Sequence, residues 1–283
     1  MPFCLVDPHD QERDLRRLFI EQIDRAQSAL TASKLRTFRT SCKRARATLH
    51  CCGDLRHDKS LRTMDRKIRS LSHTIAPARD HEAIASTARS LARISPPSDL
   101  DSLMRALARA TAPPAAPTTL TSDLRRTLRD ELGQLRTPAA DLSPTTDDFW
   151  LGIQREYRKA RQRMPTTDSP SPESLHRWRL AAKKHWYHLR LCRTIHPRLL
   201  QTMAQELRAI TQALGSCNDL TILLTLLDTL QRPDAAHLAS LARAEHAHQL
   251  HTARSRARSA FAPKPSHLVD FLRDLHRSWT RSA

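Results

Sequence analysis

Two stretches of the sequence carry side chains that can bind phosphate. Residues 36–52 (RTFRTSCKRARATLHCC) can be aligned with residues 176–192 (HRWRLAAKKHWYHLRLC), so that Phe38 matches Trp178 and Lys43 matches Lys183. Neither stretch contains Asp or Glu, although exposed helices usually place acids four positions from their bases. Arginine and lysine bind phosphate oxygens through charge-assisted hydrogen bonds. The predicted chemistry is therefore the binding of an anion.

Helical periodicity separates apolar and basic side chains in both stretches. The apolar positions share one helix face and are predicted to be buried; they are Leu35, Phe38, Cys42, Ala45 and Leu49 in the first stretch, and Leu175, Trp178, Ala182, His185 and Leu189 in the second. The basic strips lie beside these faces; they contain Arg36, Arg39, Lys43, Arg46 and His50, and His176, Arg179, Lys183 and Arg190. Without acids to pair with, each basic strip should repel itself until an anion binds.

A solvated face of an arginine-rich protein is the alternative interpretation of these strips. Lysine is scarce in this chain, yet Lys43, Lys183 and Lys184 all lie in the repeated motif. This placement favours a binding function over compositional bias.

A third basic stretch, residues 151–164 (LGIQREYRKARQRM), precedes the second motif and is predicted to form another wall of a binding groove. Its candidate residues are Arg155, Tyr157, Arg158, Lys159, Arg161 and Arg163. Of the aromatic residues, only Tyr157 and Tyr187 are predicted to be exposed, since the others near the motifs fall on or beside the apolar faces.

The elements that must position these residues are predicted to be helices. The chain has 4 Gly and 17 Pro, no stretch alternates like a strand, and the prolines separate about eleven or twelve helical segments. A proline-rich segment at 94–123 divides an N-terminal helical half, 9–112, from a C-terminal helical half, 113–283. The repeated motif suggests that one helical bundle was duplicated. Asp80 and Asp219 follow apparent breaks and are predicted to be N-caps.

Charge and composition restrict the partners. Lys and Arg number 47 against 29 Asp and Glu, for a formal net charge of +18, which favours a polyanion. The longest apolar run, residues 220–227, is too short to span a membrane, and no signal peptide is evident. Six Cys without a disulfide pattern fit a reducing compartment. We expect a cytoplasmic protein that binds no membrane.

Residues for catalysis, metals and cofactors are not evident. Glycine-rich phosphate loops are absent, and no Ser/His/Asp or Cys/His pairing suggests a nucleophile. His50, Cys51, Cys52 and His57 lack the spacing of a zinc site, and His246, His248 and His251 do not share a helix face. We expect a protein that is not an enzyme and that needs no metal or cofactor.

These motifs together resemble the CHAD domain, the conserved histidine α-helical domain, whose halves each carry a motif of the form H-x-x-R-x-x-x-K-[RK]. Residues 176–187 (HRWRLAAKKHWY) fit it closely, residues 157–161 (YRKAR) resemble the upstream motif, and residues 214–220 (LGSCNDL) resemble a downstream turn. Residues 78–80 (ARD) resemble the matching turn in the first half. The similarity extends over most of the chain.

The resemblance implies one stand-alone domain over 1–283, an antiparallel all-α fold of two pseudo-symmetric bundles around a basic groove or channel that binds inorganic polyphosphate. By position, the implied binding residues are Arg36, Arg39, Lys43 and Arg44, and His176, Arg179, Lys183, Lys184 and Tyr187. Arg36 stands where the first half of the family often has histidine. The hydrolase motif E-x-E-x-K, found in some fused relatives, is absent.

The resulting hypothesis is polyphosphate binding through basic helices, with association with polyphosphate granules. A nucleic-acid-binding helical protein is the alternative, because the same cations could follow a DNA or RNA backbone. A helical scaffold for an acidic protein is a third class. Oligomeric state and preferred chain length are not predicted.

Overall fold

The computed structural model describes residues 3–75, 77–95, 99–111 and 121–282, and every regular element among them is helical. The all-α prediction and the expected number of helices are therefore confirmed. The elements are α1 (Gln11–Thr31), α2 (Leu35–Leu49), α3 (Lys59–Thr74), α4 (Pro77–Ala92), α5 (Leu100–Thr111), α6 (Ser122–Gly133), α7 (Arg136–Ala140), α8 (Thr146–Gln162), α9 (Pro172–Leu191), the 3₁₀ turn η1 (Cys192–Thr194), α10 (Pro197–Leu230), α11 (Pro233–Ala260) and α12 (Pro265–Ser282).

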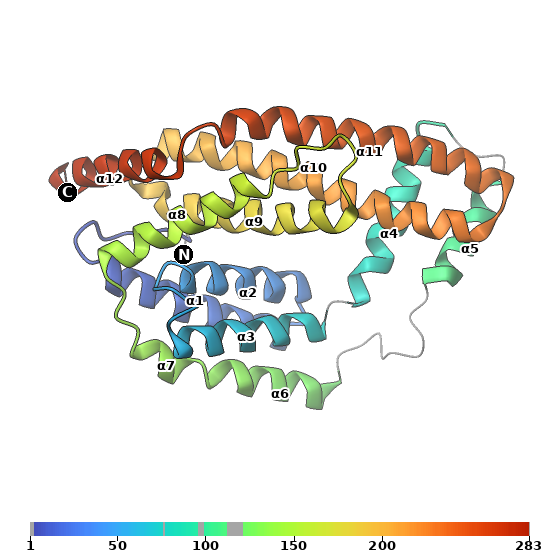
Figure 1. The fold of residues 1–283 in the computed structure, drawn as a ribbon. Helices are drawn as coiled ribbons and strands as arrows, with labels where there is room; N and C mark the ends of the chain where they lie inside the picture. The colour runs from blue at the N-terminus through green and yellow to red at the C-terminus, as the bar shows by residue number, and fades with distance from the viewer. Residues whose placement is uncertain (1–2, 76, 96–98, 112–120, 283) are drawn as a thin grey trace.

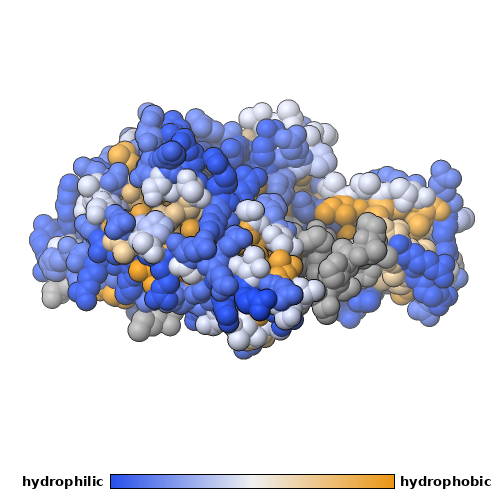
Figure 2. Space-filling view, turned by 90° about the horizontal axis from the view of Figure 1, so that it is seen from below, coloured by the Kyte–Doolittle hydropathy of each residue, from blue (hydrophilic) through white to orange (hydrophobic). Residues whose placement is uncertain are grey.

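The helices form a broad body with a narrower end (Figure 1). The larger hydrophobic core lies in the broad body, among α1–α3, α6–α9, α12 and the adjoining parts of α10 and α11. A second, smaller core joins α4 and α5 to the far halves of α10 and α11. Seen from below, the surface is mostly hydrophilic, and hydrophobic residues gather on the narrower end (Figure 2). The long helices α10 and α11 therefore connect the two cores.

Helices from the two predicted halves pack across the proposed boundary. From the first half, α4 and α5 contact α10 and α11, while α6 and α7 from the second half contact α1. Helix packing thus links the halves into one body. The boundary between residues 112 and 113 and the pseudo-symmetry of two bundles stay predictions from the sequence.

Local capping explains where α8 and α9 begin. Thr145 and Asp148 form a capping box at the start of α8, and Ser171 caps α9 with Pro172 in the first turn. The predicted N-cap at Asp219 is wrong, because residues 214–220 continue α10 as helix rather than forming a turn. The predicted N-cap at Asp80 is also wrong, because Asp80 lies inside α4, which begins at Pro77.

Among the described residues, α10 is long and apolar enough to cross a membrane by length and composition alone. Half of its most apolar 18-residue window is buried inside the fold, where α10 packs between α9 and α11. A core helix of a soluble protein meets the same criterion, so α10 is weak evidence for a membrane.

Candidate functional site

The two motif helices, α2 and α9, lie against each other and turn their predicted apolar faces inward. His188 of α9 contacts the carbonyl oxygen of Ala47 on α2 through Nε2, at 3.1 Å. The predicted core residues of both faces are buried, except Leu35, which is half-buried. The basic strips therefore border the core on adjacent helices, as expected.

Tyr187 marks the place where cations from both motif helices meet. Burial raises the pKa of its hydroxyl, and three nearby arginines act in the opposite direction. They are Arg44 of α2, and Arg190 and Arg179 of α9. Arg44 stacks over the ring of Phe3 at 5.4 Å, and this ring meets Tyr187 edge-on at 6.2 Å. The ring of Tyr187 is 4% exposed, so the prediction that it is exposed is wrong.

Further arginines from other elements surround this point. Burial lowers the pKa of Arg44, and the positive charges of Arg190 and Arg25 lower it further. Burial also lowers the pKa of Arg190, and Arg193 and Arg208 act in the same direction. We call this group the arginine cluster; its members are Arg25, Arg44, Arg179, Arg190, Arg193 and Arg208. Sequence reasoning missed Arg25, Arg193 and Arg208, because they come from α1, η1 and α10 and belong to no motif.

Within the described part of the chain, Arg44 and Arg190 contact aromatic rings rather than carboxylates. The guanidinium of Arg190 lies 5.0 Å from the centre of the Trp186 ring, and the Lys183 ammonium lies 5.9 Å from the same ring. Such cation–π contacts hold a guanidinium in place without neutralising it. The charges of these two arginines are therefore available to an anion.

The glycine of the LGSCNDL segment has a role in this site. A Cβ atom on Gly215 of α10 would lie 3.3 Å from Nε of Arg179, closer than most side-chain contacts. Glycine at this position lets the backbone of α10 approach the Arg179 guanidinium closely. The segment positions a cation although it does not form the predicted turn.

The remaining predicted cations differ in exposure. Arg36 and His176 are exposed, whereas Arg39, Lys43 and Lys183 are half-buried beside the core. They extend the basic surface along α2 and α9 away from the arginine cluster.

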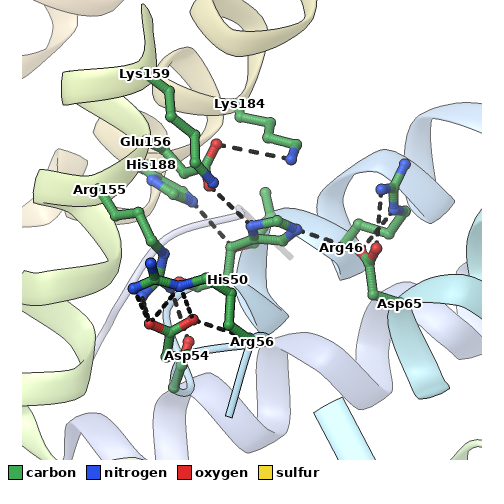
Figure 3. A network of polar contacts seen from close by, with 12 residues as sticks. Arg46, His50, Asp54, Arg56, Asp65, Arg155, Glu156, Lys159, Lys184 and His188 are labelled. Carbon is green, nitrogen blue, oxygen red and sulfur yellow. Dashed lines mark hydrogen bonds and ion pairs between the residues drawn. The ribbon is translucent and has the colours of Figure 1, made fainter. Parts of the chain in front are cut away.

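The prediction that the first basic strip lacks acidic partners is wrong, because carboxylates reach Arg46 and His50 from other helices. Glu156 of α8 is 1% exposed, and its Oε1 lies 2.7 Å from Lys159 Nζ and 3.1 Å from His50 Nδ1 (Figure 3). Its Oε2 lies 3.7 Å from Lys184 Nζ. Burial alone would raise the pKa of Glu156, but the His50 hydrogen bond and the Lys184 charge hold it well below its usual range.

Asp65 of α3 pairs with Arg46 and His50, at the same end of the first basic strip as Glu156. Arg46 donates to both Asp65 oxygens, from Nε at 2.7 Å and from a terminal nitrogen at 3.0 Å. Nε2 of His50 lies 3.3 Å from Asp65 Oδ1, so the imidazole links Asp65 to Glu156 (Figure 3). These contacts join α2, α3, α8 and α9. Apart from the Glu156–Lys159 pair within α8, they could not be seen in helical spacing, because the acid and the cation come from different helices.

The third basic stretch is only partly available for binding. Tyr157 is fully buried, its hydroxyl donates to the Pro263 carbonyl at 2.8 Å, and burial raises its pKa to about 12. Its predicted exposure is therefore wrong. Arg155 donates to the backbone carbonyl oxygens of His50 and Gly53, and Arg161 to that of Phe261. Arg158 and Arg163 are exposed.

The histidines and cysteines considered for metal binding have other roles. His50 is part of the carboxylate network, and Cys51 and Cys52 are buried free thiols. Among the described residues, no group of three or more His, Cys, Asp or Glu side chains is arranged to hold a metal ion.

Comparison with known proteins agrees with this architecture. A solved structure described as the crystal structure of the CHAD domain from the plant Ricinus communis is similar to this chain, with a TM-score of 0.54 and 19% sequence identity. The similarity covers 98% of this chain and 93% of that one, and at this identity it shows the fold alone. A comparison with curated proteins found no match. The sequence model of the CHAD domain matches residues 16–228, well over half of the sequence. The chain therefore belongs to the CHAD domain family.

Proposed function

We propose that this protein binds inorganic polyphosphate and that the arginine cluster is the centre of its site. The observation that carries the proposal is the approach of like charges from α1, α2, α9, η1 and α10. Cations held this close repel one another, and a row of phosphates would relieve the repulsion while releasing its own counterions. Membership of the CHAD domain family supports the same ligand.

The surroundings of the cluster favour a linear phosphate chain over nucleic acid. Proteins that bind single strands stack bases on exposed aromatic rings. Tyr157 and Tyr187 are buried, and Trp186 carries Lys183 and Arg190 within cation–π distance. Phosphates need only the cations. Nucleic acid stays the alternative ligand and is one of the competitors in the binding experiment.

Apart from Arg158, the predicted binding residues fall into three groups under this proposal. Arg44, Arg179 and Arg190 would contact phosphates at the centre of the site. Arg36, Arg39, Lys43, Lys183 and His176 would continue the contact along the two helices. Arg46 and Lys184 are held by carboxylates, and Tyr157, Tyr187, Arg155 and Arg161 have structural contacts. We expect this last set to support the site without touching the ligand.

The central test is a titration of labelled long-chain polyphosphate by fluorescence anisotropy at two salt concentrations. We expect the double variant Arg44→Ala/Arg190→Ala to bind much more weakly. Its slope of log K against log salt should also be smaller, by roughly 0.7 to 0.9 for each phosphate that the variant no longer neutralises, as for nucleic acids. The matched control is Arg126→Ala/Arg277→Ala, which removes two exposed surface arginines elsewhere. Equal affinity in the two double variants would refute the assignment of the site.

Competition with unlabelled duplex DNA, RNA and short phosphates identifies the ligand. Displacement by long polyphosphate alone supports the proposal, whereas equal displacement by nucleic acid favours the alternative. We further propose binding without catalysis, and phosphate released from polyphosphate during incubation with the protein would contradict it. For the proposed cytoplasmic location on polyphosphate granules, the measurement is overlap of a fluorescent fusion with a polyphosphate stain.

A further inference from the structure

A cavity of about 470 Å³ lies between α8 and the segment after α2, apart from the arginine cluster. Its volume is within the range of small-molecule sites, about 300 to 1,000 Å³. Lys159 lines the cavity, whereas Lys184 does not, and the two lysines bind different oxygens of Glu156. Buried Glu156 therefore separates this cavity from the cations of α9.

The rim of the cavity carries cations that can turn toward a ligand. The Arg56 side chain is 75% exposed and is paired with Asp54 at 2.6 Å. An exposed ion pair of this kind contributes little to stability, so a bound phosphate can recruit Arg56 at small cost. Arg158 is also exposed, with Gln154 as a hydrogen-bond partner at 3.4 Å. Lys159 also lines the cavity, but its ammonium is held by buried Glu156 at 2.7 Å.

The inner wall of the cavity is held in place before any ligand arrives. Arg155 ties His50 and Gly53 to α8 through their carbonyl oxygens, at 2.9 and 2.8 Å. The carboxylates of the lining also have structural partners. Asp54 lies 3.7 Å from the guanidinium of Arg155, and Asp148 accepts hydrogen bonds from the backbone and hydroxyl of Thr145. A site formed in advance loses less entropy when it binds.

The lining also contains apolar side chains, which an inorganic phosphate chain cannot use, and side-chain amides. Leu151 is 52% exposed and Leu55 is half-buried, and both line the cavity. Gln154 and Gln162 add side-chain amides that can donate and accept hydrogen bonds. Cations beside apolar surface and amides are complementary to an anion with an organic part.

We propose that this cavity binds a small phosphorylated organic molecule of the nucleoside di- or triphosphate class. Its phosphates would contact Arg56 and Arg158. Its organic part would lie against Leu55 and Leu151, with the glutamine amides as hydrogen-bond partners. The proposal goes beyond polyphosphate binding and does not depend on it.

The test is calorimetric titration of the full chain with adenosine triphosphate, and separately with tripolyphosphate, which has the phosphates but no organic part. We expect one molecule of adenosine triphosphate per chain and weaker binding of tripolyphosphate. Arg158→Ala should raise the Kd for adenosine triphosphate roughly tenfold or more, the usual effect of losing a hydrogen bond to a charged group. The same substitution at the remote exposed Arg126, on α6, should change nothing.

Leu151→Arg separates recognition of the organic part from general attraction to a basic protein. Because Leu151 is largely exposed, the variant should fold. It adds a positive charge where the organic part is proposed to lie, so it should weaken adenosine triphosphate binding and leave tripolyphosphate binding equal or stronger. Stronger binding of both ligands would overturn the proposal, as would no measurable binding of adenosine triphosphate or equal binding by Arg158→Ala and Arg126→Ala.

The same protein samples distinguish this proposal from polyphosphate binding. The double variant Arg44→Ala/Arg190→Ala should bind adenosine triphosphate as the unchanged protein does, because neither arginine lines the cavity. If that variant loses adenosine triphosphate binding, the nucleotide is bound at the arginine cluster and the proposed cavity site is wrong.

Discussion

Replacing Glu156 with glutamine should destabilise the protein more than any other single change of charge that we consider. Glu156 is nearly fully buried, and it is in contact with His50, Lys159 and Lys184 from α2, α8 and α9 (Figure 3). Glutamine keeps the size of the side chain and removes its negative charge. His50 and Lys184 would then lose a buried counterion, while the more exposed Lys159 could turn to water.

Breaking a buried ion pair from one side typically costs about 3 to 5 kcal/mol. Because Lys159 can be resolvated, we expect a loss near the lower end, about 3 kcal/mol. Each kcal/mol shifts Tm by about 2 to 4 °C in a protein of roughly this size, so Tm should fall by about 6 to 12 °C at pH 7. Thermal unfolding followed by circular dichroism measures the change.

The pH dependence gives the prediction a second signature. The folded-state pKa of Glu156 is lowered, so its contribution is complete above the unfolded-state value, about 4.3, and is lost as pH falls through the folded-state pKa. The difference between the two proteins should therefore shrink in acid. The matched control is Glu206→Gln, which breaks an exposed pair with Arg256 and should cost less than about 1 kcal/mol. Equal losses in the two variants at pH 7 would refute the reasoning.

Three further changes test separate parts of the structure. Gly152→Ala should cost about 3 kcal/mol in a urea titration, because its Cβ would lie 2.3 Å from the carbonyl oxygen of His50; a neutral result would contradict the close approach of α8 to α2. Tyr157→Phe should cost about 1 kcal/mol and leave polyphosphate affinity unchanged; weaker binding would indicate that the hydroxyl touches the ligand. Burial lowers the pKa of His185 and His188 to about 3. The free energy of unfolding should therefore be largest above about pH 6.5 and fall by about 2.7 kcal/mol per pH unit in acid. Equal urea midpoints at pH 6.5 and 5 would contradict this prediction.

The helices and their buried faces could be predicted because periodicity is a local property. Phe38 and Trp178 repeat with their apolar neighbours at helical spacing, and both are buried in the structure. Asp219 shows where local signals fail. Glycine and asparagine just before it suggested a break, yet α10 continues because Leu214, Leu220 and Leu223 bury their side chains on the helix. The packing of these leucines against other helices outweighed the low helix propensity of Gly215.

The composition of the site could be predicted only in part. The motif cations were found by spacing, but Arg25, Arg193 and Arg208 reach the arginine cluster through the packing of α1, η1 and α10. Glu156 and Asp65 likewise reach the basic strips from α8 and α3. No spacing within one helix encodes such contacts, because they depend on how different helices are placed against one another.

Aligned positions of the repeated motif have acquired different surroundings. Arg44 aligns with Lys184, but Lys184 is neutralised by Glu156, whereas Arg44 lies on the ring of Phe3 and faces the charge of Arg190. An ion-paired cation must give up its carboxylate before it can bind a phosphate, while a cation held among cations gains a partner that it lacked. We propose that the same motif supplies a structural contact in α9 and a ligand contact in α2. Under this proposal, the placement of Glu156 and Asp65, more than the number of basic residues, determines which cations are open to an anion.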